Sequence, residues 1–125
     1  MDVKRLCLRM KLRSLEKSIV YQNALIFKHL EKHGVSCEFI EGYVYDGVQY
    51  CWHCWVQHND IIYDYTTYII DTLMIRYIHN LPENVKEIED ENITKNKESF
   101  ALFHKDPKEF WRLAPKKIRE FKNIV

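Results

Sequence analysis

Two turn signals within residues 41–64 constrain the fold more than any other feature of the chain. Asp46-Gly47 is typical of a tight hairpin, because both central residues of a type I′ turn need positive φ. We place a second tight turn at His58-Asn59, between two runs rich in aromatic and β-branched residues. These signals predict three short antiparallel strands, at about residues 37–45, 49–56 and 61–64.

The second turn determines which side chains meet across the last two strands. A two-residue loop at His58-Asn59 places His53 directly opposite Asp64. Directly opposed residues of an antiparallel pair have Cβ atoms about 4.5–5.5 Å apart on one face. A loop at Asn59-Asp60 would instead place Thr66 opposite His53. Our prediction follows the first turn and brings an imidazole beside a carboxylate, which is either a structural hydrogen bond or part of a catalytic site.

Alternation along the strands divides the predicted sheet into two faces. The face that carries His53 is mainly apolar and is expected to receive a preceding helix; its other members are Ile40, Gly42, Cys51, Trp55 and Ile62. The opposite face combines large rings with a carboxylate, and its members are Phe39, Glu41, Tyr43, Trp52, Cys54 and Tyr63. Rigid rings contribute contact area at low entropy cost, so this second face is a candidate partner surface. Core packing is the alternative explanation for the same rings.

The remaining segments supply helices around this sheet, which we place at residues 37–70. Apolar residues recur at helical spacing over 15–34, where Gly34 ends the predicted helix. The basic segment 1–14 is either a first helix or an extended arm, and residues 65–79 hold a further strand or a turn into a short helix. Residues 82–98 are predicted to form a charged loop. Asp106-Pro107 begins a C-terminal helical segment over 106–122, which Pro115 interrupts.

Length and composition indicate one α+β domain over residues 1–125, with a formal charge of +1. No apolar run approaches the ~20 residues of a membrane span, and the charged N-terminus does not resemble a signal peptide. We therefore expect a cytoplasmic protein whose four cysteines are reduced thiols. Cations gather near both ends of the chain without forming a continuous stripe, so nucleic acid is not an expected partner.

Four short motifs, in order, carry a resemblance to a known superfamily. They are Tyr21-Gln22-Asn23-Ala24, Glu41-Gly42-Tyr43, His53-Cys54-Trp55-Val56 and Tyr63-Asp64-Tyr65-Thr66. Over roughly residues 15–70 the chain resembles the papain-like and transglutaminase-like cysteine hydrolases, most of all their small microbial and viral branches. In that pattern a Cys-x-x-Asn-Ala helix precedes Glu-Gly-Tyr, His-x-Trp and Asp-x-Thr strands. The resemblance implies an α+β fold in which a thiolate at a helix N-terminus meets the histidine, while the aspartate orients that histidine.

The chain departs from the pattern at the nucleophile. Val20 stands three residues before Asn23, where the superfamily has its cysteine, and a valine cannot form a thioester. Ser18 lies about 200° around the helix from that position and should face elsewhere. The candidate displaced thiols are Cys51, which shares a strand face with His53, and Cys7, whose cationic neighbours would lower a thiol pKa.

Two functions follow from these observations. The first is a catalytically silent protein-binding module, for which a phage or viral factor acting on a host protein is the expected setting. Its candidate binding residues are Asn23, Glu41, Tyr43, Trp52 and Trp55. The second is an active cysteine hydrolase or acyltransferase on an amide or ester, with His53 as general base and Asp64 as its orienter. The oligomeric state stays open.

A zinc site is the third hypothesis. Cys51-x-x-Cys54, with His53 and His58, supplies four ligand types within a short stretch. In an extended strand, however, the two cysteines project to opposite faces, whereas zinc sites with this spacing usually place the pair on a tight turn. No second Cys or His pair follows at the expected distance. We therefore expect neither a metal nor another cofactor.

Overall fold

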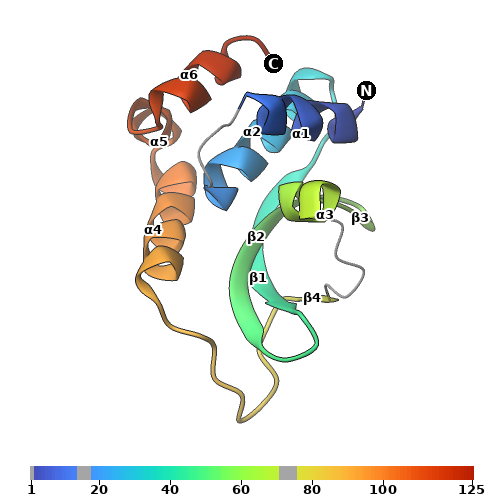
Figure 1. The fold of residues 1–125 in the computed structure, drawn as a ribbon, viewed down its shortest axis with the longest axis vertical. Coiled ribbons are helices and arrows are strands. Elements are labelled where there is room, and N and C mark those ends of the chain that lie inside the picture. The colour runs from blue at the N-terminus through green and yellow to red at the C-terminus, as the bar shows by residue number, and fades with distance from the viewer. Residues whose placement is uncertain (1, 14–17, 71–75) are drawn as a thin grey trace.

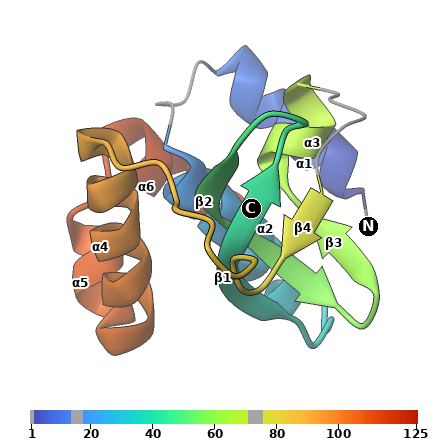
Figure 2. The same cartoon turned by 90° about the horizontal axis from the view of Figure 1, so that it is seen from below.

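The structure, a computed structural model, describes residues 2–13, 18–70 and 76–125. Its elements are α1 (Val3–Leu12), α2 (Ile19–Lys32), β1 (Glu38–Tyr45), β2 (Tyr50–His58), β3 (Ile61–Tyr63), α3 (Tyr65–Ile70), β4 (Arg76–Ile78), α4 (Glu91–Lys105), α5 (Pro107–Arg112) and α6 (Lys116–Lys122). The strands form one antiparallel sheet in the order β3-β2-β1-β4. The sheet curls, with α4 and α5 on one side and α1 and α3 near the opposite side (Figures 1 and 2). The fold is therefore α+β, as the sequence predicts.

The first hairpin turns one residue later than its sequence signal suggests. Tyr45 faces Tyr50, so the loop consists of residues 46–49. Its centre lies between Gly47 and Val48, whereas the predicted centre lies between Asp46 and Gly47. The Asp46 carboxylate accepts hydrogen bonds from the backbone N–H groups of Val48 and Gln49, at 2.8 and 2.9 Å. Asp46 thus stands before the turn, and Gly47 alone takes the positive φ, of 100°. A side chain that bonds the backbone in this way favours the first position of a turn.

The second hairpin also differs from the prediction. His58 faces Ile61, so the loop consists of Asn59 and Asp60, and the predicted turn at His58-Asn59 is wrong. Asn59 supplies the positive φ, of 52°, which asparagine tolerates better than histidine does. Moving the loop by one residue shifts the pairing of β2 with β3 by two residues. Because side chains alternate between the faces, a shift of two residues leaves each side chain on its predicted face.

The helices cover the face opposite to the predicted one. Phe39 lies 6.3 Å from Phe27 of α2 and 4.9 Å from Phe100 of α4, measured between ring centroids. Trp52 lies 5.8 Å from the same Phe100 ring. The prediction that the long helix packs on the His53 face is therefore wrong. The larger rings lie on the other face, where their burial removes more apolar area from water.

The N-terminal segment is a helix rather than an arm. Asp2 caps α1 by accepting a hydrogen bond from the Arg5 backbone N–H at 3.0 Å. The apolar stripe of α1 is buried and consists of Val3, Leu6, Cys7 and Met10. The predicted helix 15–34 corresponds to α2, and the part of that range at 15–17 lies outside the described residues. Gly34 follows α2 with a φ of 78°, as its place after the last turn predicts.

The second half of the predicted loop at 82–98 is wrong, because α4 begins at Glu91. Asp90 caps this helix by accepting from the Ile93 N–H at 2.8 Å. Its buried residues are Ile93, Phe100 and Phe103, and only Ile93 lies within 82–98, so that range by itself shows no helical period. The C-terminal segment is confirmed as two helices separated at Pro115. No helix in the described ranges is both long and apolar enough to cross a bilayer.

Candidate active site

The polar centre of the molecule is the carboxylate of Asp64, which lies where β3 ends and α3 begins. Asp64 is fully buried. Its Oδ1 accepts hydrogen bonds from Asn23 Nδ2 and from the Thr66 backbone N–H, both at 3.1 Å. Its Oδ2 accepts from His53 Nε2 at 2.8 Å and from Tyr77 Oη at 2.6 Å. Four donors fill the acceptor capacity of a carboxylate, so the buried charge lacks no partner.

The pKa of Asp64 reflects two opposing effects. Burial raises the pKa of this carboxyl group, because it disfavours the charged form. The hydrogen bond and positive charge of His53, with the hydrogen bonds from Tyr77 and Asn23, outweigh burial and lower the pKa below its ordinary value of 3.8. Asp64 is therefore a carboxylate at neutral pH.

Asn23 joins helix α2 to the edge of the sheet. Its Nδ2 donates to the Cys54 carbonyl at 2.8 Å, and its Oδ1 accepts from the Tyr65 N–H at 2.8 Å. If the pairing of β2 with β3 continued for two more residues, Cys54 and Tyr65 would face one another. The Asn23 amide thus lies between two backbone groups that a longer β3 would have paired directly. This side chain ends the strand pairing and satisfies the groups it leaves open.

Tyr77 reaches Asp64 from the other edge of the sheet. It lies on β4, where it faces Val44 of β1, whereas Asp64 follows β3. The two edge strands approach one another because the sheet curls around the His53 face. The Tyr77 hydroxyl also lies 2.6 Å from Thr67 Oγ1, so the Thr67 hydroxyl donates to Tyr77 while Tyr77 donates to Asp64. Burial, followed by the charge of Asp64, raises the pKa of Tyr77 and keeps it a donor.

The contact between His53 and Asp64 that the sequence predicts is present, although the register behind it is wrong. In the observed register, continued by one residue, Asp64 would lie beside Trp55, so Asp64 is a diagonal neighbour of His53 on the same face. The carboxylate fixes the His53 proton on Nε2. Within the described residues no group forms a hydrogen bond with Nδ1. A general base would use such an unbonded ring nitrogen.

None of the four thiols contacts the His53 ring through a hydrogen bond. Val20, at the position that the resemblance gives to the nucleophile, is fully buried on α2. Burial, followed by the charge of Asp64, raises the pKa of Cys7 to about 12. Burial also raises the pKa of Cys37, Cys51 and Cys54. A raised pKa leaves little thiolate at neutral pH, and the thiolate is the nucleophile.

Three of the five candidate binding residues are buried, namely Asn23, Trp52 and Trp55. Trp52 is 5% exposed beneath α4, and its Nε1 donates to Glu41 Oε2 at 3.0 Å. Trp55 is 1% exposed, and a Cβ added to Gly42 would come within 2.5 Å of its ring. Asn23 is fully buried, and Tyr43 is half-buried. On this sheet face Phe39 and Trp52 belong to the core beneath α4, whereas Glu41 is exposed and Tyr43 is partly exposed, so a partner surface there stays a prediction.

Cys51 and Cys54 lie three residues apart on the extended strand β2, so their side chains fall on opposite faces. In the described parts of the chain no three His, Cys, Asp or Glu side chains gather in a way that could hold a metal ion.

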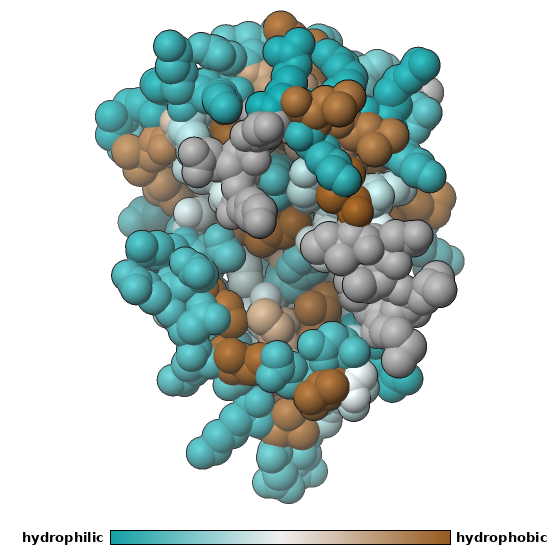
Figure 3. Space-filling model, viewed as in Figure 1, coloured by the Kyte–Doolittle hydropathy of each residue, from teal (hydrophilic) through white to brown (hydrophobic). Residues whose placement is uncertain are grey.

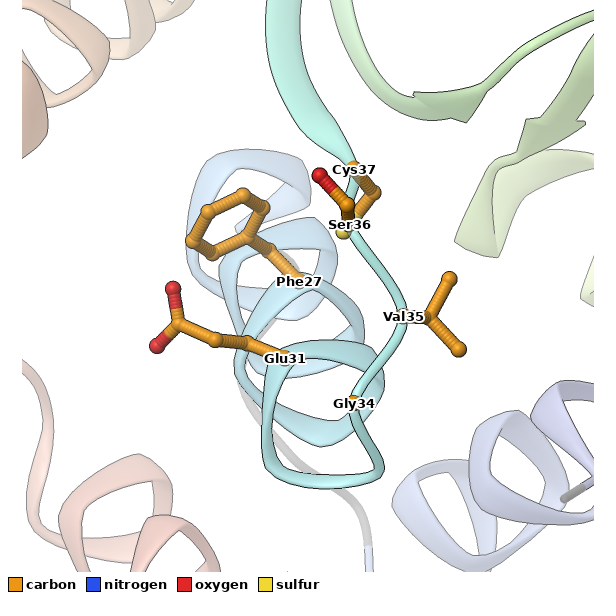
Figure 4. A pocket seen from close by; sticks show the side chains of 6 residues that line it. All are labelled: Phe27, Glu31, Gly34, Val35, Ser36 and Cys37. Atoms are coloured by element: carbon orange, nitrogen blue, oxygen red, sulfur yellow. The ribbon is translucent and has the colours of Figure 1, made fainter.

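Two surface hollows among the described residues lie away from Asp64. The pocket in Figure 4 has a volume of about 320 Å³ and lies between the end of α2 and the start of β1, lined by Phe27, Glu31, Gly34, Val35, Ser36 and Cys37. A second hollow of about 390 Å³ shares Ser36 and Cys37 and continues toward His58. Neither hollow is lined by His53 or Asp64.

Sequence reasoning missed Tyr77 and Thr67 as members of the Asp64 network. Tyr77 lies 13 residues from Asp64, and its contact depends on the pairing of β4 with β1, for which no turn signal exists. Thr66 carries a local signal, because an Asp that precedes a helix often accepts from a backbone N–H of its first turn.

The fold and this centre define a class: an α+β domain with a buried histidine–aspartate pair that an asparagine and a tyrosine support. Comparisons with protein-family models, with curated proteins and with solved structures find no match to the chain. The resemblance to papain-like and transglutaminase-like hydrolases stays a prediction from the four sequence motifs.

Proposed function

We propose that this chain is a catalytically silent relative of the papain-like and transglutaminase-like hydrolases that acts by binding another protein. The observation that carries the proposal is the state of the site. His53 and Asp64 are joined as an orienting pair, yet none of the four thiols forms a hydrogen bond with His53. Val20 fills the predicted nucleophile position in the core. The pair is thus retained as part of the structure after loss of the nucleophile.

The hydrogen bonds of Asp64 support a structural role for the pair. Removing a partner from a buried ionic network leaves uncompensated polar groups, which costs several kcal/mol. Asp64 holds α2 through Asn23, β2 through His53 and β4 through Tyr77. Selection for folding alone would therefore retain the histidine and aspartate in a protein without catalysis.

One observation favours a second candidate, an active cysteine hydrolase or acyltransferase. His53 Nδ1 is without a hydrogen bond among the described residues, as a general base awaiting a proton would be. In this alternative a natural thiol gives its proton to that nitrogen and attacks the substrate carbonyl, so that a thioester forms and the C–N or C–O bond breaks with release of the amine or alcohol. Water or an acceptor then takes the acyl group and frees the thiol. The raised pKa values of all four thiols weigh against it.

The first test measures the natural thiols. The wild-type protein is treated with iodoacetamide at neutral pH, and the modified cysteines are followed by mass spectrometry. We expect slow modification of all four cysteines, unchanged in His53→Ala. Rapid modification of one natural cysteine, abolished by His53→Ala, would establish the active enzyme instead.

The second test restores sulfur at the nucleophile position. Val20 precedes Asn23 by three residues on α2, so the two side chains lie on neighbouring positions of one face. In Val20→Cys we expect ultraviolet absorbance to show an added thiolate at neutral pH, about tenfold more than a thiol of ordinary pKa would give. The signal should disappear in Val20→Cys with His53→Ala, and it should be absent from Ile26→Cys, a buried position on another face of α2. No thiolate in Val20→Cys would mean that this position is not a degenerate nucleophile site.

A further inference from the structure

The fold brings the two basic ends of the sequence together. Helices α1 and α6 lie near one another at the same end of the molecule (Figure 1), and Arg9 and Arg13 lie 5.4 and 5.7 Å from the centroid of the Phe121 ring of α6. We call the cations of these helices the α1/α6 surface: Lys4, Arg5, Arg9, Lys11, Arg13, Lys116, Lys117, Arg119 and Lys122. All are exposed except Lys122, which is partly buried. The two basic ends, far apart in the sequence, therefore meet at one end of the molecule.

These cations are largely without counter-charges. Within the described residues, Lys116 alone of the nine forms an ion pair, with Glu120 at 3.8 Å, and both groups are strongly exposed. In the acidic region two cations are paired: Lys97 contacts Glu87 at 2.7 Å, and Lys95 contacts Glu91 at 3.4 Å. Like charges gathered at one end destabilise the folded chain through repulsion. Such a surface gains free energy when an anionic partner covers it.

Apolar side chains interrupt the charge. Leu8 and Leu12 are 44% and 83% exposed and lie one turn apart on α1, on the helix face that also carries Lys4 and Lys11. Figure 3 shows small apolar areas within the hydrophilic surface over the end of the molecule that holds α1 and α6. The surface thus presents two leucines flanked by cations.

We propose that the α1/α6 surface binds an acidic segment of another protein that also carries apolar side chains. The inference rests on the proposed function, because it identifies the partner chemistry of the binding module. Carboxylates of the partner pair with the cations, while its apolar side chains cover Leu8 and Leu12. Charge complementarity of this kind steers association, and burial of the leucines adds affinity.

Two other anionic partners fit these features less well. A phosphate backbone would neutralise the cations but would give Leu8 and Leu12 no apolar contact. A membrane surface would need an apolar helix face to insert, and the apolar stripe of α1, with Leu6 and Met10, is already buried in the core. An acidic, partly apolar protein segment satisfies both the cations and the leucines.

The test compares four probes against the full chain by fluorescence titration. The first is a synthetic helical peptide that repeats Glu-Glu-Leu-Leu, and the second is a charge-matched peptide that repeats Glu-Glu-Ser-Ser. The others are a DNA duplex and vesicles of phosphatidylserine with phosphatidylcholine. We expect the leucine-containing peptide to bind most tightly and to lose affinity as salt is raised.

Matched variants locate the binding. Lys4→Glu with Lys11→Glu should weaken peptide binding about tenfold, since two attractions become repulsions. Lys86→Glu with Lys95→Glu changes the net charge equally but lies outside the α1/α6 surface, and it should have little effect. Leu8→Ser with Leu12→Ser should weaken the leucine peptide and leave the serine peptide unchanged.

Three outcomes would overturn the inference: tighter binding of DNA or of vesicles, equal weakening by both charge pairs, or no binding of the leucine peptide. Failure here is distinct from failure of the proposed function. The thiol experiments on Val20→Cys and His53→Ala probe the interior of the protein and do not involve the α1/α6 surface.

Discussion

The two faces of the sheet are stabilised by different kinds of interaction. On one face, Phe39 and Trp52 pack against rings of α2 and α4, and the contacts are apolar and without strong direction. On the other face, His53 and Tyr77 converge on a single oxygen of Asp64, at 2.8 and 2.6 Å. Apolar contacts tolerate an exchange of shape, whereas a buried polar network needs every partner in place.

The comparison shows where this fold is specific. We call the face with Phe39 and Trp52 the ring face. Its apolar side chains favour packing of helices on the sheet, and many other apolar sequences would do the same. The Asp64 network decides how the curled edges meet, because it bonds α2, β2 and β4 at once. Substitutions on the two faces should therefore differ in cost even where they remove similar volumes.

The largest effect is expected for Asp64→Ala. The substitution leaves His53, Asn23 and Tyr77 without their common acceptor, and it should lower the free energy of unfolding by about 3–5 kcal/mol. Urea unfolding followed by circular dichroism measures the change. Asp60→Ala, at an exposed loop position, is the control and should change little. A loss below about 1 kcal/mol for Asp64→Ala would mean that the network does not organise the fold.

Asn23→Ala should follow. It removes the amide that bridges the Cys54 carbonyl and the Tyr65 N–H, and leaves buried backbone groups unpaired. We expect a loss of about 2–3 kcal/mol in the same urea assay. Asn92→Ala on the exposed side of α4 is the matched control. If β3 can lengthen and pair Cys54 directly with Tyr65, the loss will be small, and amide exchange at Tyr65 will show continued protection.

The sequence predicted the contact between His53 and Asp64 for a reason that survives an incorrect turn. The loop lies one residue later than predicted, and this changes the register by two, so both side chains stay on one face. Alternation is thus a firmer guide to a site than the exact partner across a strand pair. The prediction that the helix over 15–34 packs on the His53 face is wrong, because it follows the number of apolar residues on each face. The aromatic rings of Phe39 and Trp52 on the opposite face contact the helices instead.

Other parts of the site had no local signal. Tyr77 joins the network because the sheet curls until its two edges approach, and that curl is a property of the whole sheet. No local signal indicated that α4 would cover Phe39 and Trp52 on the face that also carries Glu41. Residues 82–98 looked like a loop because the buried residues of α4 are sparse and its exposed side is charged.

The pH dependence of stability tests the charge on Asp64. The folded pKa of this carboxyl lies below its ordinary value of 3.8. The charged form therefore stabilises the folded state above that value, and this stabilisation is lost as pH falls from 3.8 through the folded pKa. The unfolding free energy of the wild type should fall in that acid range, and Asp64→Asn should show a shallower fall. Parallel curves for the two proteins would assign the acid sensitivity to other carboxylates.

The smallest effect is expected on the ring face. Phe39→Leu keeps an apolar side chain between Phe27 and Phe100, and neighbouring rings can adjust to the lost volume. We expect a loss of about 1 kcal/mol in urea, well below that of Asp64→Ala. A loss as large as that of Asp64→Ala would show that the ring face also depends on a unique geometry. The two faces would then differ in the kind of interaction, apolar contacts or hydrogen bonds, and not in their tolerance to substitution.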